Sequence, residues 1–111
     1  MDYVANVKRL SDRLTALKIP HKNLGMSIIF LEPRTTHIAF GNTIHYEGKW
    51  TEADVICKPM SYGSDEGLFE VSGIDLMTPK ECAEDSVVGY LSMEEVVERV
   101  VKAYKEYKNR G

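Results

Sequence analysis

MSIIFLEPRTTHIAFGNTIHYEGKWTEADVICK, residues 26–58, contains most of the strand-forming sequence of this chain and decides its fold. Its β-branched and aromatic residues favour extended structure, and its Gly, Pro and polar positions divide it into segments. The dipeptide Gly41-Asn42 predicts a tight hairpin turn. We expect Pro33 to end the first strand and a polar turn over Glu47–Asp54 to precede the last. The expected strands are at about residues 26–32, 36–40, 43–47 and 53–58.

The predicted hairpin carries two of the three histidines, so a metal site has to be considered there. A two-residue turn would pair Ile38 with His45 and His37 with Tyr46. His37 and His45 would then lie on opposite faces of the hairpin. Zinc sites need three or four converging ligands, and no Cys or Cys/His set has suitable spacing. We therefore expect no metal and no cofactor.

Residues near the last of these strands have structural explanations. Trp50 is the only tryptophan, and we expect its large ring to cover the core. Cys57 shares a strand face with Val55 and is expected to be a small buried apolar residue, because no base is indicated beside it. In a reducing compartment Cys57 and Cys82 are expected to be free thiols.

A helix is predicted before the strand-rich segment, over residues 3–17. Asp2 is placed to cap its start, and Pro20 requires it to end near Lys18. Apolar residues recur at three- and four-residue spacing and form one stripe. The stripe consists of Tyr3, Val4, Val7, Leu10, Leu14 and Leu17.

Two helices are predicted after a further strand at residues 68–72. Thr78 has the features of an N-cap, with Pro79 and Glu81 following it, and begins a short helix over about 79–85. Met77 and Cys82 are placed as its hydrophobic staple. Ser92 begins a longer capped helix that ends near Lys108.

These segments fit a single α+β domain over residues 1–111. The expected architecture is an antiparallel sheet of four to five strands with the N- and C-terminal helices packed on one face. A length of 111 residues suits one domain and leaves no room for two.

The charge distribution narrows the class of partner. The net charge is −3, but residues 52–98 contain 12 acidic residues against Lys58 and Lys80. A general nucleic-acid binder needs a basic footprint, so we expect no nucleic-acid partner. No apolar run approaches the length of a membrane span and the N-terminus lacks a signal-peptide pattern, so we expect a cytoplasmic protein that does not bind membranes. An acidic face suits a basic protein partner, and also suits a surface that is merely solvated.

The segment after the last of those strands is the candidate functional loop. Residues 59–67 are rich in turn formers and longer than most connections in a compact domain. The loop has no P-loop or dinucleotide-binding pattern, and no nucleophile–base set is indicated. We expect a protein that is not an enzyme, with Tyr62, Asp65, Glu66 and Glu70 contacting a protein partner.

Alternatives to this hypothesis stay open. The chain is also compatible with a small-molecule-binding domain or minor enzyme, with a pocket near residues 59–67 that uses Tyr62, His45 and Glu70. A third possibility is an acidic mimic of nucleic acid. The Val/Tyr stripe of the last helix is also compatible with self-association as a homodimer, although core packing is the preferred explanation.

YGSDEGLFEVSG at Tyr62–Gly73 and DSVVGYLSMEEVVERV at Asp85–Val100 carry a resemblance to a known group. The pattern resembles small phage- and prophage-type proteins of Gram-positive bacteria and covers about half of the chain. The resemblance implies a mobile genetic element and a bacterial cytoplasm as the setting. It implies no catalytic residue, because the group has no assigned activity. The absence of catalytic motifs and the acidic bias of residues 52–98 are what indicate a non-enzymatic interaction or regulatory module.

Overall fold

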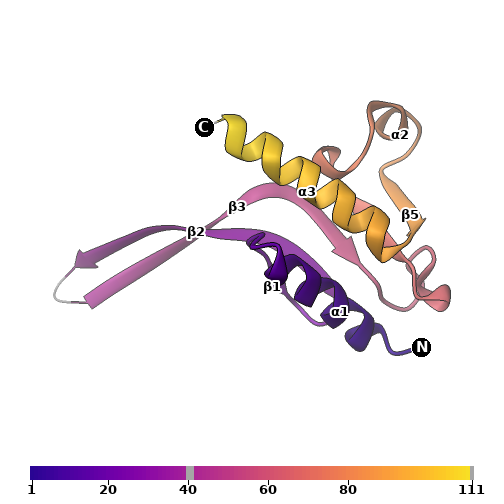
Figure 1. Cartoon of the computed structure of the whole chain (residues 1–111), viewed down its shortest axis with the longest axis horizontal. Coiled ribbons are helices and arrows are strands. Elements are labelled where there is room, and N and C mark those ends of the chain that lie inside the picture. Colours follow the sequence, from indigo (N-terminus) through magenta and orange to yellow (C-terminus); the bar gives the residue numbers. More distant parts are fainter. Residues whose placement is uncertain (40–41, 111) are drawn as a thin grey trace.

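The computed structural model of this chain describes the backbone of residues 1–39 and 42–110, and the side chains of residues 1–32 and 48–110. Within these residues the sheet has five antiparallel strands in the order β1-β2-β3-β4-β5 (Figure 1). The single-domain α+β prediction is confirmed. The elements are α1 (Tyr3–Ala16), β1 (Lys22–Asn23), β2 (Ser27–Ala39), β3 (Asn42–Ile56), the 3₁₀ turn η1 (Ser64–Glu66), β4 (Phe69–Ser72), the 3₁₀ turn η2 (Ile74–Leu76), α2 (Pro79–Glu84), β5 (Val87–Leu91) and α3 (Met93–Arg110).

The central hairpin is longer and less divided than the sequence predicts. β2 continues through Pro33, which pairs with Glu47, so the prediction that Pro33 ends a strand was wrong. The register shifts between Pro33 and Thr35. Such an irregularity lets a residue without an amide proton lie within a strand. The segments predicted at residues 26–32 and 36–40 are therefore one strand.

A bulge in β3 replaces the polar turn that was predicted over Glu47–Asp54. The strand pairs on either side of the bulge are Leu31–Lys49 and Ile29–Asp54. Residues 50–53 therefore stand opposite Phe30 alone, and β3 runs without a break from Asn42 to Ile56. The bulge places Trp50, Thr51 and Ala53 in buried positions.

The far half of the β2–β3 hairpin extends beyond the two long helices (Figure 1). Ile38 pairs with Thr43, His37 with Ile44 and His45 with Thr36, so the predicted pairing was wrong by two positions. Residues 40–41, which include half of the predicted turn, lie outside the described residues. The side chains of His37 and His45 lie outside them too, so their facing stays a prediction.

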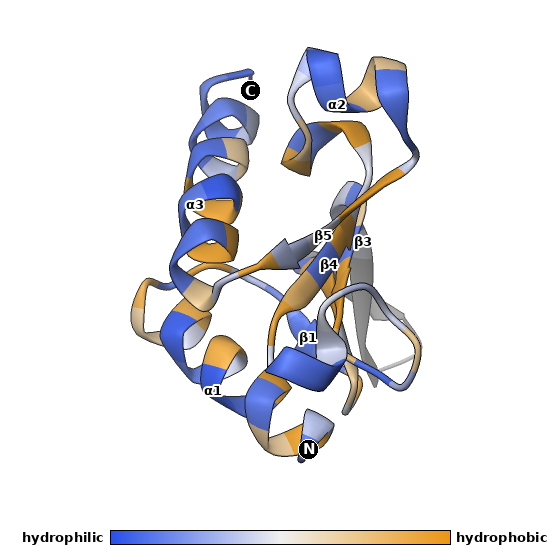
Figure 2. Cartoon of the chain, turned by 90° about the vertical axis from the view of Figure 1, so that its right-hand side faces the viewer, coloured by the Kyte–Doolittle hydropathy of each residue, from blue (hydrophilic) through white to orange (hydrophobic). Residues whose placement is uncertain are grey.

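The core lies between the sheet and two helices. α1 and α3 cover the same face of the sheet (Figure 1), and Figure 2 shows their hydrophobic sides turned inward. The prediction that these helices share one face is confirmed. Burying apolar surface in this layer is the main favourable term for folding, at about 25 cal/mol per Å². The buried residues include Val7, Leu10 and Leu14 of α1, Val96, Val97, Val100 and Ala103 of α3, and Ile28, Phe30, Val55, Phe69, Val71 and Leu91 of the sheet.

Two members of the predicted α1 stripe are not in the core. Val4 and Leu17 are 53% and 48% exposed. Leu17 lies outside because α1 ends at Ala16 and Leu17 is its C-cap. Val4 lies beside the buried side of α1 that Val7 and Leu10 occupy, and faces solvent.

Among the described residues, no helix is both long and apolar enough to cross a membrane.

Trp50 covers one end of the core, as predicted. It is 6% exposed, and its Nε1–H donates a hydrogen bond of 2.8 Å to the Pro20 carbonyl oxygen. Its ring lies 5.1 Å from the Phe30 ring and 5.0 Å from the Tyr104 ring, measured between centroids. Such aromatic contacts add to the free energy gained from burial.

The predicted helix caps are confirmed, but the predicted staple is not. Asp2 accepts from the Ala5 amide at 2.9 Å, and Thr78 and Ser92 accept from the amides three residues later at 3.2 Å each. Both cysteines are free, and Cys57 is buried as expected. Cys82 is exposed, and α2 has no buried residue. α2 therefore lies outside the core, and the staple of Met77 and Cys82 stays a prediction.

Candidate functional site

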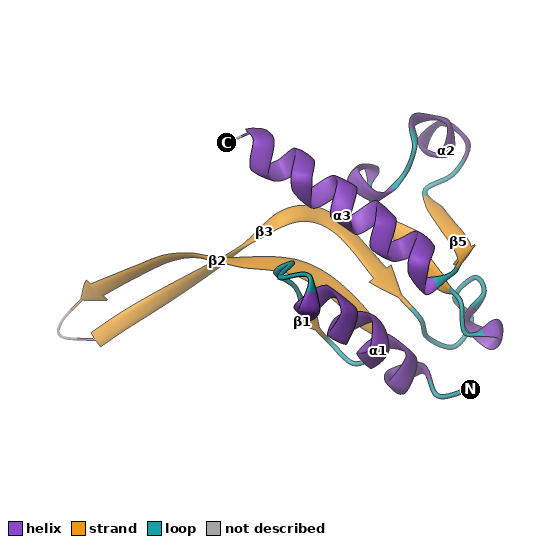
Figure 3. Ribbon diagram, viewed as in Figure 1, coloured by secondary structure: helices purple, strands orange, loops and turns teal. Residues whose placement is uncertain are grey.

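The loop between β3 and β4 lies at the opposite end of the sheet from the projecting hairpin (Figure 3). A hollow of about 310 Å³ opens beside this loop. Tyr90 of β5 also lines the hollow, although it is far from the loop in sequence. We call the hollow the loop pocket; it is lined by Met60, Ser61, Tyr62, Gly63, Asp65, Glu66 and Tyr90.

Hydrogen bonds hold the loop in one conformation. The Ser61 hydroxyl donates to the Lys58 carbonyl oxygen at 2.8 Å and accepts from the Lys58 amide at 3.0 Å. The Leu68 amide donates to the Gly63 carbonyl oxygen at 2.9 Å. Asn6 of α1 donates to the Gly67 carbonyl oxygen at 2.7 Å. These bonds preorganise the loop, so ordering it would cost little conformational entropy when a partner binds.

Two glycines bring the loop against β5. A Cβ atom at Gly89 would lie 2.2 Å from the Tyr62 Cβ, and one at Gly63 would lie 2.9 Å from the Tyr90 Cα. The Tyr90 amide donates to the Tyr62 carbonyl oxygen at 3.1 Å. The two tyrosines therefore flank one hollow, and their side chains are 56% and 61% exposed.

The backbone is strained at two residues of the loop pocket. Met60 and Tyr90 have φ angles of 72° and 59°, in the left-handed region that side chains other than glycine rarely adopt. Each such residue costs about 1–2 kcal/mol, which the rest of the fold has to supply. Met60 is 96% exposed. The two strained residues therefore both expose large side chains to solvent.

The carboxylates of this region have no basic partner. Among the described side chains no ion pair reaches Asp65, Glu66 or Glu70. Asp65 has only a long 3.4 Å contact from the Tyr3 hydroxyl, and Glu70 accepts from the Tyr62 amide at 3.2 Å. The loop pocket therefore combines uncompensated negative charge with exposed aromatic and apolar surface.

The structure brings together most of the residues that the sequence indicated. Tyr62, Asp65 and Glu66 all line the loop pocket. Glu70 does not line it; it lies on β4 and holds the Tyr62 amide. Sequence reasoning missed Met60 and Tyr90. The position of Met60 directly after Pro59, in a segment rich in turn formers, was a weak sequence signal that it belongs to the site. Tyr90 joins the site only through the pairing of β5 with β4.

The residues of the alternative hypothesis do not come together. His45 and Ile56, the last residue of β3, pair with Thr36 and Ser27 of β2, which are nine residues or roughly 30 Å of strand apart, whereas Tyr62 follows the end of β3. A site that uses both residues is therefore not formed within one chain. Among the described residues, no group of three or more His, Cys, Asp or Glu side chains has an arrangement that could hold a metal ion.

No protein-family model matches the chain, and comparisons with curated proteins and with solved structures give no significant match.

Proposed function

We propose that this protein is a small non-enzymatic interaction module that binds a basic segment of a partner protein in the loop pocket. One observation carries the proposal. Exposed Met60, Tyr62 and Tyr90 share a hollow with Asp65 and Glu66, and no cation of the described chain neutralises these carboxylates. Exposed apolar and aromatic side chains gathered at one hollow are typical of an interaction site.

The chemistry of the hollow favours a lysine- or arginine-containing segment. A cation close to a tyrosine ring is attracted by its negative face, with about 0.5–1 kcal/mol at exposed sites. Carboxylates at the rim add long-range attraction and select against acidic partners. The aromatic rings supply apolar contact area with few rotatable bonds, so ordering them costs little entropy.

The proposed setting follows the resemblance to phage- and prophage-type proteins. In that setting a phage-encoded module would act in the bacterial cytoplasm as a regulator of a basic host or phage protein. The proposal needs no cofactor and assigns no catalytic step. Self-association is the competing use of the same surface, with a second copy of the chain as the occupant.

A direct test measures binding of fluorescent peptides of defined sequence by polarisation. Short peptides that combine Lys or Arg with an apolar residue are compared with peptides in which Glu replaces each basic residue. We expect saturable binding of the basic set alone. Affinity should fall as salt rises, because ions screen exposed charges. Equal binding of both sets, or binding of neither, would contradict the proposal.

Two matched double variants localise the effect. Asp65→Asn/Glu66→Gln removes two negative charges from the loop pocket, and Glu84→Gln/Glu98→Gln removes two from exposed positions elsewhere. We expect about five- to tenfold weaker binding for the first variant and little change for the second. Equal losses would show that net charge, and not the pocket, attracts the peptide. Sedimentation of the wild type and of Tyr90→Ala shows whether a second copy occupies the surface instead.

A further inference from the structure

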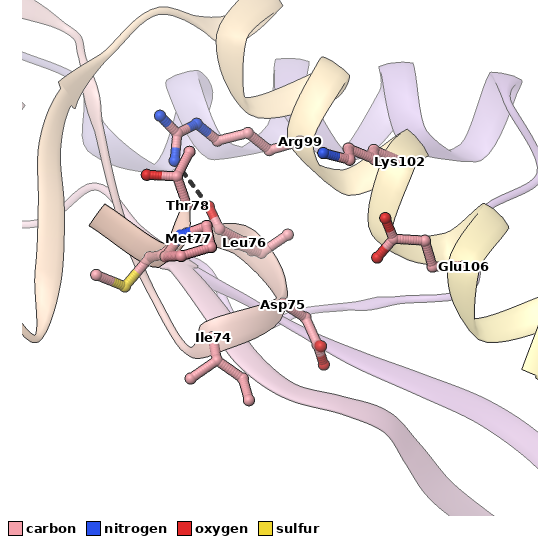
Figure 4. A pocket seen from close by; sticks show the side chains of 9 residues that line it. Ile74, Asp75, Leu76, Met77, Thr78, Arg99, Lys102 and Glu106 are labelled. Carbon is pink, nitrogen blue, oxygen red and sulfur yellow. Dashed lines mark hydrogen bonds between the residues drawn. The ribbon is translucent and has the colours of Figure 1, made fainter. Parts of the chain in front are cut away.

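A second and larger hollow, of about 440 Å³, lies between η2, the start of α2 and α3 (Figure 4). We call it the helix pocket. Its size falls within the range of small-molecule sites, about 300–1,000 Å³. It shares no residue with the loop pocket. It is lined by Ile74, Asp75, Leu76, Met77, Thr78, Pro79, Arg99, Lys102 and Glu106.

Arg99 builds the frame of the helix pocket and pairs with Glu81 in doing so. Its Nη1 donates to the Leu76 carbonyl oxygen at 2.8 Å and to Glu81 Oε1 at 2.7 Å, and its Nη2 donates to Glu81 Oε2 at 2.9 Å. The hydrogen bonds from Arg99 lower the pKa of Glu81 from 4.5 to about 2. Arg99 therefore joins η2, α2 and α3, and its charge is already neutralised.

Asp75 is likewise engaged within the fold. Its Oδ2 accepts from the Thr51 hydroxyl at 2.5 Å, and its Oδ1 lies 3.8 Å from Arg110 Nη2. Neither Asp75 nor Arg99 is thus available as the main partner of a ligand.

Lys102 and Glu106 are the two charged residues of the lining that take no part in these interactions. Among the described residues no hydrogen bond or ion pair reaches either side chain. Both extend from α3 toward η2, one helical turn apart (Figure 4). The order Lys before Glu is the weaker arrangement for pairing along a helix. The helix pocket therefore offers one ammonium group and one carboxylate to whatever enters it.

Apolar side chains of η2 and the residue that follows it supply another part of the lining. Ile74 is 79% exposed, Met77 is half-buried, and both line the pocket together with buried Leu76. An exposed isoleucine at the edge of a hollow gains free energy when a ligand covers it.

We infer that the helix pocket binds a small zwitterion with an apolar side chain, of the class of a free aliphatic α-amino acid. The ligand carboxylate would pair with Lys102, its ammonium group with Glu106, and its side chain would cover Ile74 and Met77. A simple anion meets the repulsion of Glu106 and Asp75, and a simple cation meets that of Lys102. Only a molecule with both charges matches both unpaired groups.

The test is calorimetric titration of the full chain with leucine, leucinamide and N-acetylleucine. Leucinamide lacks the carboxylate and N-acetylleucine lacks the ammonium group. We expect saturable binding of leucine. Each derivative should bind at least about tenfold more weakly than leucine, because it loses one charge-assisted hydrogen bond. No saturable heat with leucine, or equal binding of the three compounds, overturns the inference.

Single variants locate the bound molecule. Lys102→Gln and Glu106→Gln are each expected to weaken leucine binding about tenfold. Lys105→Gln, an exposed residue of α3 outside the pocket, is the matched control and should leave binding unchanged. An equal loss in the control contradicts the site. Thermal midpoints of all three variants, expected to equal that of the wild type, check that folding is intact. Asp65→Asn/Glu66→Gln should not alter leucine binding, so this inference and the proposed function fail independently.

Discussion

The loop pocket and the helix pocket differ in how their charges are balanced. In the helix pocket Arg99 pairs with Glu81 and Asp75 lies near Arg110, and the remaining Lys102 and Glu106 are equal and opposite. In the loop pocket Asp65 and Glu66 form no ion pair with any of the described side chains. The larger hollow is thus electrically neutral and the smaller one is acidic. In our two proposals, the charge left uncompensated after folding, and not the size of the hollow, decides which ligand each hollow accepts.

The largest effect is expected from Gly89→Ala, which breaks the loop pocket alone. The new Cβ would lie 2.2 Å from the Tyr62 Cβ, so the loop has to move away from β5. We expect a loss of about 1–3 kcal/mol in the free energy of unfolding, measured in urea, together with loss of basic-peptide binding. Leucine binding in the helix pocket should persist.

Gly25→Ala is the control for that variant. A Cβ at Gly25 meets nothing within 4 Å, although its φ angle of 104° strains an alanine. This variant should cost about 1 kcal/mol and leave peptide binding intact. Normal peptide binding by Gly89→Ala would show that the contact between Tyr62 and β5 does not form the loop pocket.

The next effect is expected from Glu81→Gln, which breaks the charge balance of the helix pocket. Glutamine retains the capping box, so the variant isolates the charge of the ion pair with Arg99. The pKa of Glu81 is lowered to about 2 by Arg99, and the two side chains are 26% and 23% exposed. After allowance for solvent screening, we expect a loss of about 1–2 kcal/mol at neutral pH.

The pH dependence of that loss gives a sharper measurement. A carboxyl with a lowered pKa stabilises the folded state above its unfolded pKa, and this contribution disappears as the pH falls through the folded pKa. The difference between wild type and Glu81→Gln should be full above pH 4.5 and vanish near pH 2. Urea unfolding over this range measures it. A difference that does not change with pH would exclude the charge as its source.

A smaller effect is expected from Glu66→Lys, which gives the loop pocket a cation next to its remaining carboxylate. The side chain is exposed, so stability should be unchanged. Affinity for basic peptides should fall about tenfold, and the preference over acidic peptides should narrow. Polarisation with both peptide sets measures the change. An unaltered preference would place the basic partner elsewhere.

The smallest effect is expected from Glu94→Gln, because its partner Arg13 lies on the surface. The hydrogen bond from Arg13 lowers the pKa of Glu94, but the two side chains are 44% and 69% exposed. Exposed ion pairs of this kind contribute little. We expect no measurable shift in the thermal midpoint and none in either binding assay. A shift in the thermal midpoint as large as that of Glu81→Gln would show that the surface pair Arg13–Glu94 contributes as much as the partly buried pair Arg99–Glu81.

Features with a local cause were predictable from the sequence. The caps at Asp2, Thr78 and Ser92 follow from residues no more than three positions apart, and the three predicted helices were found within two residues of their bounds at each end. Three of the four candidate residues that the sequence indicated do line the loop pocket, since turn formers and charge gather there.

Features that depend on distant pairing were not predictable. β5 is a short strand with Gly89 at its centre, and only its pairing with β4 brings Tyr90 to the loop pocket. The bulge opposite Phe30 depends on the register of β2 against β3. The polar residues around Trp50 are typical of a turn and gave no indication of this register. Residue periodicity reports which side of an element is buried, but not which element lies next to it.

The position of Trp50 gives this chain a built-in optical probe. It is the only tryptophan, and its ring contacts Tyr104 and Tyr107 of α3, with ring centroids 5.0 and 5.6 Å away. Those tyrosines stand on the same helix as Lys102 and Glu106. Intrinsic fluorescence should therefore follow the docking of α3 on the sheet without any label, because undocking would expose the indole to water. One spectral signal can thus report both unfolding and any movement of α3 that ligand binding causes.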